Sequence, residues 1–312
     1  MKKALAFLLL ALCCALNAKE LKVLAIGNSF SVCVTRNLPQ MVASVPGNRI
    51  ILTSATIGGC SLERHWNEWS KAEKDAKHAT YGIKVIDSDN ISAQKSGKGN
   101  VNDLLKNNKY DIITIQQNSA NSWNYATYQP YAEKLIAVIK KYQPQAEIVI
   151  QQTWSYRSDS SRLKKWKINN TTMFEKLSAA YAELAKANGF RVIPTGYAVQ
   201  IFRAETPVKF VAPDLKALEK LQNKEAHGFD GEVAGYCKWM RNRKTKEYYL
   251  GCDTSHLNPH GEYMQAAVWF SFLFGEKATA VKYIQPGMKP EQAKFLLECA
   301  QEAVSTFKQP GK

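Results

Sequence analysis

The sequence predicts a three-layer α/β protein, with a mostly parallel sheet of five strands between two layers of helices. Two observations support this prediction. Runs rich in β-branched residues, at 111–115 and 147–150, have the continuous apolar character of buried parallel strands. Longer segments with helical spacing alternate with such runs along the chain, and this alternation is typical of a parallel sheet covered by helices.

Each predicted element has its own local signal. The first strand ends at Gly27, and a helix begins near Ser31. A later helix stops before Pro144 and the next is closed by Gly189, because proline and glycine end helices. The expected strands are 21–26, 49–55, 111–115, 147–150 and 190–193, and the expected helices are about 31–45, 131–142, 172–188, 259–274 and 290–307.

Two stretches interrupt the alternation of strands and helices. The first, at about 64–100, is polar, with a short strand expected at 81–86. The second, at about 203–251, is rich in lysine and aromatic side chains. Neither has enough periodic apolar residues for a core of its own. We therefore interpret both as long insertions in a single domain at 19–312, of the kind that shapes a binding cleft.

The first eighteen residues have the layout of a secretory signal peptide, with a basic start, an apolar run at 4–16 and a small residue before Lys19. The run is too short for a comfortable transmembrane helix, which argues against an uncleaved anchor. Cys13 and Cys14 lack small residues correctly placed ahead of them, which argues against a lipoprotein. We expect cleavage after residue 18 and a secreted or periplasmic protein with no later membrane span.

The chain is basic, with a formal net charge of +15 that falls to about +13 without Lys2 and Lys3. The lysines are scattered, and no zinc-finger or helix-turn-helix spacing occurs, so we do not expect a nucleic acid as partner. Attraction to an anionic polysaccharide or to an anionic cell surface would explain the positive charge. A simple effect on solubility would explain it equally well.

The cysteines left after cleavage are odd in number, so at least one thiol stays unpaired even in an oxidising compartment. Two pairings are open: Cys237 with Cys252, which flank a hairpin-like stretch, or Cys60 with Cys252, which both adjoin candidate site residues. No Cys/His cluster indicates a metal, and no cofactor is expected. The five remaining cysteines are Cys33, Cys60, Cys237, Cys252 and Cys299.

Candidate functional residues lie directly after the predicted strands and before the penultimate helix. In an open parallel sheet the carboxyl ends of the strands form one edge, where ligands bind. The segments at that edge supply a hydroxyl, flexible backbone amides, side-chain amides and an Asp/His pair, which together are what acyl transfer by a serine needs. The residues are Ser29, Gly59, Gln117, Asn118, Asp253 and His256.

The chemistry assigns a role to each of these residues. We expect Ser29, in a tight strand-to-helix turn, to be the nucleophile and His256 to be its base. Asp253, three residues earlier, is placed to hold the Nδ1 atom of His256 and set its tautomer. The expected oxyanion donors are the backbone N–H groups of Ser29 and Gly59, with the side-chain amide of Asn118.

Alternatives exist for the base and the nucleophile. His260 is a weaker candidate base, because it follows Pro259 inside a predicted helix. Cys60 and Cys252 are weaker candidate nucleophiles, because neither begins a turn that follows a strand.

These motifs resemble those of the GDSL, or SGNH, hydrolases. The Gly-Asn-Ser turn at 27–29 is similar to their opening Gly-Asp-Ser block, Gly59 matches the glycine of the second block, and Asp253-x-x-His256 is similar to the closing block. A bacterial branch, the DUF4886 type, is more similar still. Its Gly-Asn-Ser-Phe-Ser opening, its Gly-Gly-x-Ser-Leu-Glu-x-His-Trp block and its Gln-Gln pair occur here at 27–31, 58–66 and 116–117.

The resemblance spans roughly residues 21–275 and implies a flavodoxin-like SGNH hydrolase fold with serine esterase activity. Asn28 replaces the common aspartate, a change that is tolerable because that residue transfers no proton. Gln116 replaces the glycine of the third block, so Gln117 is an alternative to Asn118 as oxyanion donor. The two insertions mean that the resemblance does not imply a particular substrate.

The function predicted from these residues is an exported serine esterase that hydrolyses a small acyl ester. An acetyl ester on a carbohydrate is the first expectation, and a lipid or aryl ester is the second. A non-catalytic glycan-binding protein on the same fold is the alternative, although it would not need all of Ser29, Asp253 and His256. Aromatic side chains that stack on sugars are expected in the cleft, unless they belong to the core; the candidates are His65, Trp66, Trp123 and Trp154.

Overall fold

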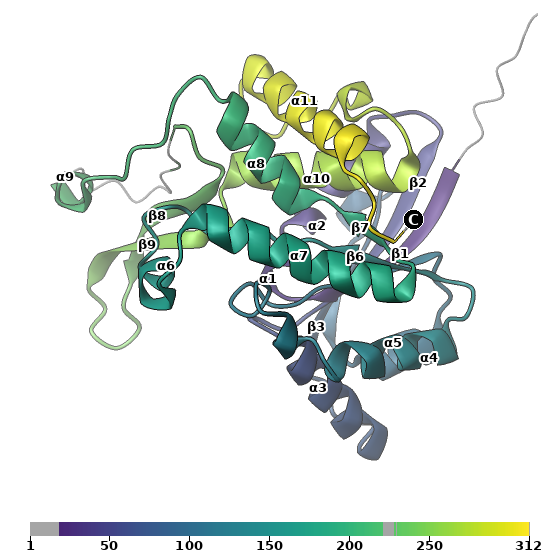
Figure 1. Ribbon diagram of the computed structural model, residues 1–312. Coiled ribbons are helices and arrows are strands. Elements are labelled where there is room, and N and C mark those ends of the chain that lie inside the picture. The colour runs from purple at the N-terminus through teal and green to yellow at the C-terminus, as the bar shows by residue number, and fades with distance from the viewer. Residues whose placement is uncertain (1–18, 221–227, 229, 312) are drawn as a thin grey trace, which may run out of the picture.

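A seven-stranded sheet forms the centre of the computed structural model, which describes residues 19–220, 228 and 230–311 (Figure 1). The predicted signal peptide lies outside the described residues. The strand order is β4-β3-β2-β1-β5-β6-β7. The strands are β1 (Lys19–Gly27), β2 (Asn48–Thr56), β3 (Tyr81–Asp87), β4 (Lys95–Gly99), β5 (Ile112–Ile115), β6 (Glu147–Gln151) and β7 (Arg191–Ile193).

Five neighbouring strands of this sheet pair in parallel and coincide with the five predicted strands; they are β2, β1, β5, β6 and β7. The prediction of a three-layer α/β fold is therefore confirmed. The count of five is wrong for the whole sheet, because β3 and β4 extend it with antiparallel pairing. Both come from the first predicted insertion, where only the strand at 81–86 was expected. Strand β4 has the polar sequence Lys-Ser-Gly-Lys-Gly and is mostly exposed, so it carries no apolar alternation.

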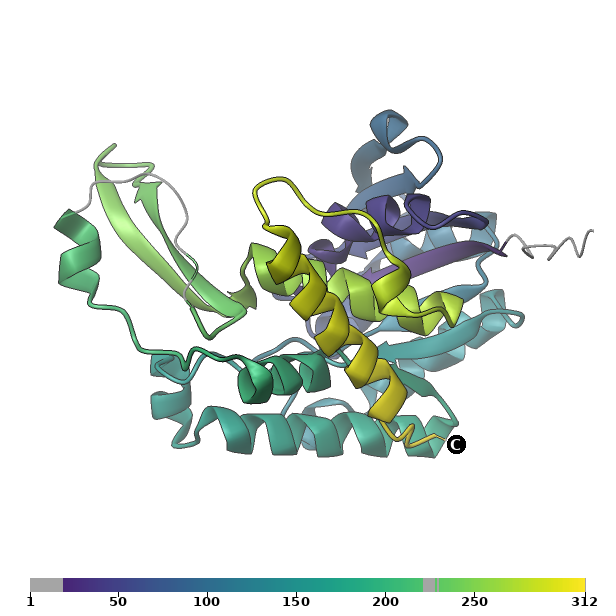
Figure 2. The same cartoon turned by 90° about the horizontal axis from the view of Figure 1, so that it is seen from above.

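Helices cover both faces of the sheet, as right-handed crossovers between parallel strands require (Figure 2). One layer contains α2 (Val34–Ala43), α8 (Thr195–Glu205) and α10 (Pro259–Phe274), with α11 (Pro290–Thr306) packed outside it. The other contains α3 (Leu62–Lys74), α4 (Val101–Asn107), α5 (Tyr131–Tyr142) and α7 (Asn170–Asn188). The shorter helices are α1 (Ser29–Val32), α6 (Ser161–Trp166), α9 (Leu215–Lys220), η1 (Ile91–Ala93), η2 (Tyr125–Thr127) and η3 (Ala278–Ala280).

Helix α10 lies at the centre of its layer, between α2 and α8 and beneath α11, and is buried along nearly all of its length. A helix enclosed on all sides is apolar all round rather than along one stripe. None of the helices in the described ranges combines the length and the apolar character needed to cross a membrane.

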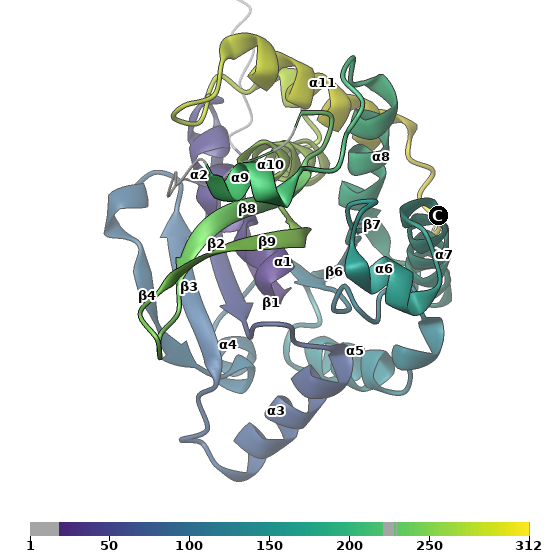
Figure 3. The same cartoon turned by 90° about the vertical axis from the view of Figure 1, so that its left-hand side faces the viewer.

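The second predicted insertion contains α9 and a hairpin of β8 (Ala234–Arg241) and β9 (Tyr248–Leu257) that projects from the body of the protein (Figure 1, Figure 2). In the view of Figure 3 the hairpin lies in front of the sheet. A disulfide joins Cys237 to Cys252, which are direct partners across the two strands. This settles the pairing that the sequence left open, and the other three described cysteines are free and buried. Strand β9 continues past the predicted end of the insertion to the start of α10.

Candidate active site

Ser29 is the first residue of α1, directly after the turn that ends β1. Asn28 caps this helix, and its Oδ1 atom accepts a hydrogen bond from the Phe30 N–H at 3.0 Å. The Asn28 side chain is buried, whereas Ser29 is partly exposed. The turn therefore presents the Ser29 hydroxyl at the carboxyl end of the central strand, where ligands of parallel sheets bind.

A buried amide network holds this turn against the loops that follow β2 and β5. The Asn28 Nδ2 atom donates to the Cys60 carbonyl at 3.0 Å, and Gln116 Nε2 donates to Asn28 Oδ1 at 2.8 Å. The Ser31 hydroxyl donates to Gln116 Oε1 at 2.8 Å. An aspartate at position 28 could accept the same hydrogen bond from Gln116, but it has no amide hydrogen to donate to the Cys60 carbonyl.

His256 and Asp253 meet Ser29 from β9. The Ser29 Oγ atom lies 2.7 Å from His256 Nε2, and His256 Nδ1 lies 2.6 Å from Asp253 Oδ2. The other carboxylate oxygen, Oδ1, accepts from the Ser255 N–H, the Ser255 hydroxyl and the His256 N–H at 2.7–2.9 Å. The structure thus brings together the three residues that the sequence singled out.

Burial alone raises the pKa of Asp253, but hydrogen bonds from the His256 ring and from the His256 and Ser255 N–H groups outweigh it. Together with the His256 charge, they hold the pKa of this carboxyl well below its usual range. Asp253 therefore stays ionised beside the His256 ring and fixes Nδ1 as the protonated nitrogen.

A bulge in the hairpin lets Asp253 reach His256. Between two paired positions β8 advances two residues, from Ala234 to Tyr236, while β9 advances four, from Asp253 to Leu257. The extra residues on β9 turn the His256 ring toward Asp253, which a regular strand would not do at this spacing, because its side chains alternate. No strand was predicted from the sequence at these positions, where the structure has the bulged strand β9.

Gly235 makes this bulge possible. Its φ of +92° lies in the left-handed region, and a Cβ atom there would lie 2.8 Å from Arg157 Nη1 and 2.9 Å from the Asp253 carbonyl oxygen.

Phe30 and Trp154 form an aromatic platform beneath the His256 ring. Their rings stack at 4.1 Å between centroids, and the His256 ring meets Phe30 edge-on at 5.1 Å. The Trp154 indole donates to the Ser255 carbonyl at 2.8 Å, which ties β9 to the core.

Asn118 lies beside the Gly59 loop. Its Nδ2 atom donates to the Gly59 carbonyl at 3.1 Å, and its Oδ1 atom accepts from the Asn121 N–H at 3.0 Å, which fixes the orientation of the amide. Gly59 has a φ of +62°. Neither the Ser29 nor the Gly59 N–H donates to a backbone carbonyl within the described part of the chain.

Gln117 is not available to a substrate. Its side chain is fully buried, Nε2 donates to the Thr127 carbonyl and hydroxyl, and Oε1 accepts from the Leu62 and Asn118 N–H groups. The alternative that assigned the oxyanion role to Gln117 is therefore wrong, because this amide holds the loop in place.

An open pocket of about 410 Å³ adjoins Ser29 and His256. The Arg36 guanidinium pairs there with the Glu262 carboxylate, and burial raises the pKa of Glu262 against the opposing effect of Arg36. Tyr236 and Lys238 of β8 form part of its wall. These four lining residues were not predicted from the sequence, because only the packing of the hairpin against α1 and α10 brings them beside Ser29.

The four residues predicted for the cleft do not line this pocket. Trp154 is fully buried in the platform. Trp66 packs on the core with the Lys134 ammonium over its ring, and Trp123 packs on Trp166. These predictions were wrong, because aromatic residues near a site in sequence also serve the core beneath it.

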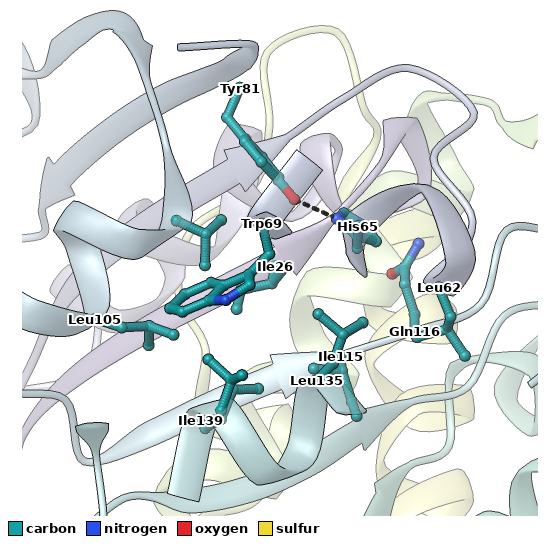
Figure 4. A pocket seen from close by; sticks show the side chains of 12 residues that line it. Ile26, Leu62, His65, Trp69, Tyr81, Leu105, Ile115, Gln116, Leu135 and Ile139 are labelled. Carbon is teal, nitrogen blue, oxygen red and sulfur yellow. Dashed lines mark hydrogen bonds between the residues drawn. The ribbon is translucent and has the colours of Figure 1, made fainter. Parts of the chain in front are cut away.

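The fourth residue, His65, lines an apolar cavity of about 10 Å³ between the sheet and helices α3, α4 and α5 (Figure 4). Its Nδ1 atom lies 2.8 Å from the Tyr81 hydroxyl, and the ring is buried. Burial, with the nearby Arg64 charge, lowers the pKa of His65 to about 3, so the ring stays neutral at physiological pH.

The alternative nucleophiles and base do not meet Ser29. Burial raises the pKa of the Cys60 thiol to about 12, which leaves it without thiolate character, and Cys252 is in the disulfide. His260 lines a different pocket, beside Asp230.

A family model described as a domain of unknown function, DUF4886, matches residues 22–211. A DUF4886 family protein from Bacteroides uniformis has a similar solved structure, with 24% identity, a TM-score of 0.72, and coverage of 92% of this chain and 96% of that one. The predicted resemblance to this family is thus confirmed. No match was found among curated proteins.

Two further solved structures are less similar to this chain in sequence and in fold. A Slackia heliotrinireducens protein, proposed to be an SGNH hydrolase, has 16% identity and a TM-score of 0.46, over 82% of this chain and all of that one. The acetyl xylan esterase AlAXEase has 12% identity and a TM-score of 0.39, over 80% of this chain and 98% of that one.

Proposed function

The chain belongs to the DUF4886 family, and on that premise we propose that it is a serine esterase that hydrolyses a small acyl ester. The observation that carries the proposal is the pair of contacts that links Ser29 Oγ, His256 and Asp253 at 2.7 and 2.6 Å. Asp253 and His256 lie beyond the residues that the family model matches, so their geometry supports their roles independently of the family.

In the proposed reaction Ser29 Oγ attacks the ester carbonyl carbon while its proton passes to His256 Nε2. Collapse of the tetrahedral intermediate breaks the bond to the alcohol, and His256 returns the proton to the departing oxygen. Water then attacks the acyl-enzyme with His256 again as base, which releases the acid and restores the Ser29 hydroxyl. Asp253 stays ionised throughout and stabilises the protonated His256 ring.

Three donors are available for the oxyanion: the N–H groups of Ser29 and Gly59, and the side-chain amide of Asn118. The Asn118 amide supports this role because its Nδ2 atom faces the Gly59 loop and has a second hydrogen to donate. Fixed donors of this kind stabilise the charge that develops on the carbonyl oxygen.

We assign the substrate to acetyl esters of carbohydrates. The pocket beside Ser29 is open and carries charged and hydroxyl groups from Arg36, Glu262, Lys238 and Tyr236. Such a wall favours a polar alcohol portion of the ester over a lipid chain, which would need an extended apolar groove.

We also propose that the protein is exported, with residues 1–18 removed. The Cys237–Cys252 disulfide supports this, because such bonds persist in oxidising compartments. Mass spectrometry of the protein secreted by its natural host should give Lys19 as the first residue; an intact N-terminus would contradict cleavage.

The test of esterase activity compares wild type with Ser29→Ala on p-nitrophenyl acetate. We expect kcat/KM to fall by about 10³-fold or more, because the nucleophile and base act as a unit. Ser305→Ala, the same change on the exposed surface of α11, is the matched control and should retain wild-type rates.

A fluorophosphonate probe tests nucleophilicity without any assumption about the substrate. Labelling of Ser29 in wild type, and its loss in Ser29→Ala, are expected. Equal background rates for both proteins, with no labelling, would indicate a non-catalytic glycan-binding protein on the same fold.

A further inference from the structure

The β8–β9 hairpin has an exposed face that continues from the Ser29 pocket. Side chains of a two-stranded ladder alternate between its faces, so cross-strand partners two positions apart share a face. The partners Tyr236 and Asp253, then Lys238 and Gly251, then Met240 and Tyr249 lie on one face in this order. Tyr236, Lys238 and Asp253 line the Ser29 pocket. We call the side chains of Tyr236, Lys238, Met240 and Tyr249 the hairpin strip.

The outer end of the hairpin strip is apolar and open to solvent. Met240 is 38% exposed and Tyr249 is 47% exposed. Of the seven large hydrophobic residues exposed in the described chain, six fall within 208–249, and three of these are on the hairpin. Such clustering marks an interaction surface, whereas singly scattered exposed hydrophobic residues need no explanation.

Positive charge surrounds the hairpin strip. Between positions 238 and 247 the sequence holds five basic side chains against one acidic, Glu247. None of the ion pairs within the described part of the chain involves these basic side chains. Within the described residues, the side chains of Arg241 and Lys246 donate to backbone carbonyls of the turn. The basic residues are Lys238, Arg241, Arg243, Lys244 and Lys246.

We propose that the hairpin strip binds an anionic polysaccharide whose sugar rings carry carboxylates, and leads its acylated segment to Ser29. Sugar rings stack on the exposed ring of Tyr249, and their carboxylates pair with Lys238 and the basic turn. A polymer fits this arrangement because the hairpin strip follows the strand ladder outward from the pocket, and the hairpin itself projects from the body of the protein (Figure 2). The inference rests on the proposed esterase function and specifies the alcohol portion of its substrate.

The test measures binding in the Ser29→Ala background, so that no ester bond is cut. Isothermal titration calorimetry compares polygalacturonate with a neutral xylan of similar length at low ionic strength. We expect binding of polygalacturonate only, weakened by added salt, since salt screens exposed charges. The triple variant Lys238→Glu/Arg243→Glu/Lys244→Glu should raise the Kd about tenfold or more.

A charge-matched control distinguishes the hairpin from the overall charge of the protein. Exchange of Lys74, Lys77 and Lys109 for glutamate changes the net charge equally, at exposed positions near α3 and α4. This control should leave the Kd within about twofold of the parent. Equal weakening by both triple variants would overturn the proposal.

Two neighbouring tyrosines test the stacking contact. Tyr249 is on the hairpin strip, whereas Tyr248, paired with Arg241, is on the opposite face and is similarly exposed, at 51%. Tyr249→Ala should raise the Kd several-fold and Tyr248→Ala should not. Equal effects of the two changes would contradict binding along this face.

The same binding experiment also tests other classes of partner. Equal binding of neutral xylan, or tighter binding of duplex DNA or phosphatidylglycerol vesicles than of polygalacturonate, would overturn the proposal. An esterase that binds no polyanion would refute this inference alone. A polyanion binder that hydrolyses no ester would refute the proposed function alone.

Discussion

Ser29 and His256 meet at one hydrogen bond, yet the segments that carry them are supported in different ways. Ser29 follows a central strand and is held by the buried amides of Asn28 and Gln116, which are each 2% exposed. His256 and its partner Asp253 lie on a bulged strand of a projecting hairpin, with side chains that are 35% and 26% exposed. The core therefore positions the nucleophile, and the projecting hairpin supplies the base.

This difference predicts that the two sides respond differently to mutation. A change on the core side should lower both stability and activity, because the same buried hydrogen bonds serve both. A change on the hairpin side should lower activity with little effect on global stability, because the hairpin adds little to the core.

Asp253→Asn should lower turnover of p-nitrophenyl acetate by about 10³- to 10⁴-fold, because the amide no longer fixes the His256 tautomer. The thermal unfolding midpoint should change little. Kinetics and calorimetry on the same preparation check both statements. Asp75→Asn, an exposed aspartate at the end of α3, is the control; turnover close to wild type in Asp253→Asn would remove Asp253 from the proposed machinery.

Loss of the disulfide should loosen the hairpin and leave the core intact. A bond that closes a loop of this size, with a sequence separation of 15, is worth up to about 3 kcal/mol. In the Cys237→Ser/Cys252→Ser variant, amide hydrogen exchange should accelerate in β8 and β9 and stay unchanged in β1 and β5. Activity should fall, since Asp253 follows Cys252 directly. Equally accelerated exchange in β1 would show that the hairpin is part of the cooperative core.

Gln116→Leu should lower both stability and activity. It removes the hydrogen bonds to Asn28 and Ser31 and leaves buried polar atoms without partners, at a cost of about 2 kcal/mol. The unfolding midpoint should fall by a few degrees, and turnover should fall with it as the Ser29 turn loses support. Gln94→Leu, at an exposed position, is the matched control. Reduced activity at an unchanged midpoint would contradict a shared network.

The smallest effect concerns acid. Hydrogen bonding holds the pKa of Asp253 below the ordinary value of 3.8, so its contribution to stability is present above that pH and is lost as the pH falls below it. The amides of Asn28, Gln116 and Gln117 do not titrate. Wild type should therefore unfold at a higher temperature than Asp253→Asn near neutral pH. This difference in unfolding midpoint should shrink as the pH falls below 3.8, which calorimetry at a series of pH values measures. A difference that widens in acid would reverse the sign of the assigned shift.

The correct and incorrect predictions from the sequence have a common physical origin. The five parallel strands were predictable because strands buried on both faces leave continuous apolar runs. Ser29 was predictable because it follows such a run directly. Strand β4 was not, since an exposed edge strand needs no apolar side chains. Trp154 was assigned to the cleft, but an indole that supports a site from below has the same sequence signature as one that lines it.

Local sequence patterns specify the layered fold and the residue types that meet at the sheet edge, because periodicity and post-strand turns are local properties of the chain. The remaining features arise only from packing in the folded protein. This packing paired Cys237 with Cys252, assigned Gln117 to support Asn118, and placed Asp253 and His256 on a bulged strand. It also brought the walls of the pocket together from segments distant in sequence. These features depend on which side chains face each other across the folded chain, and no local pattern records that.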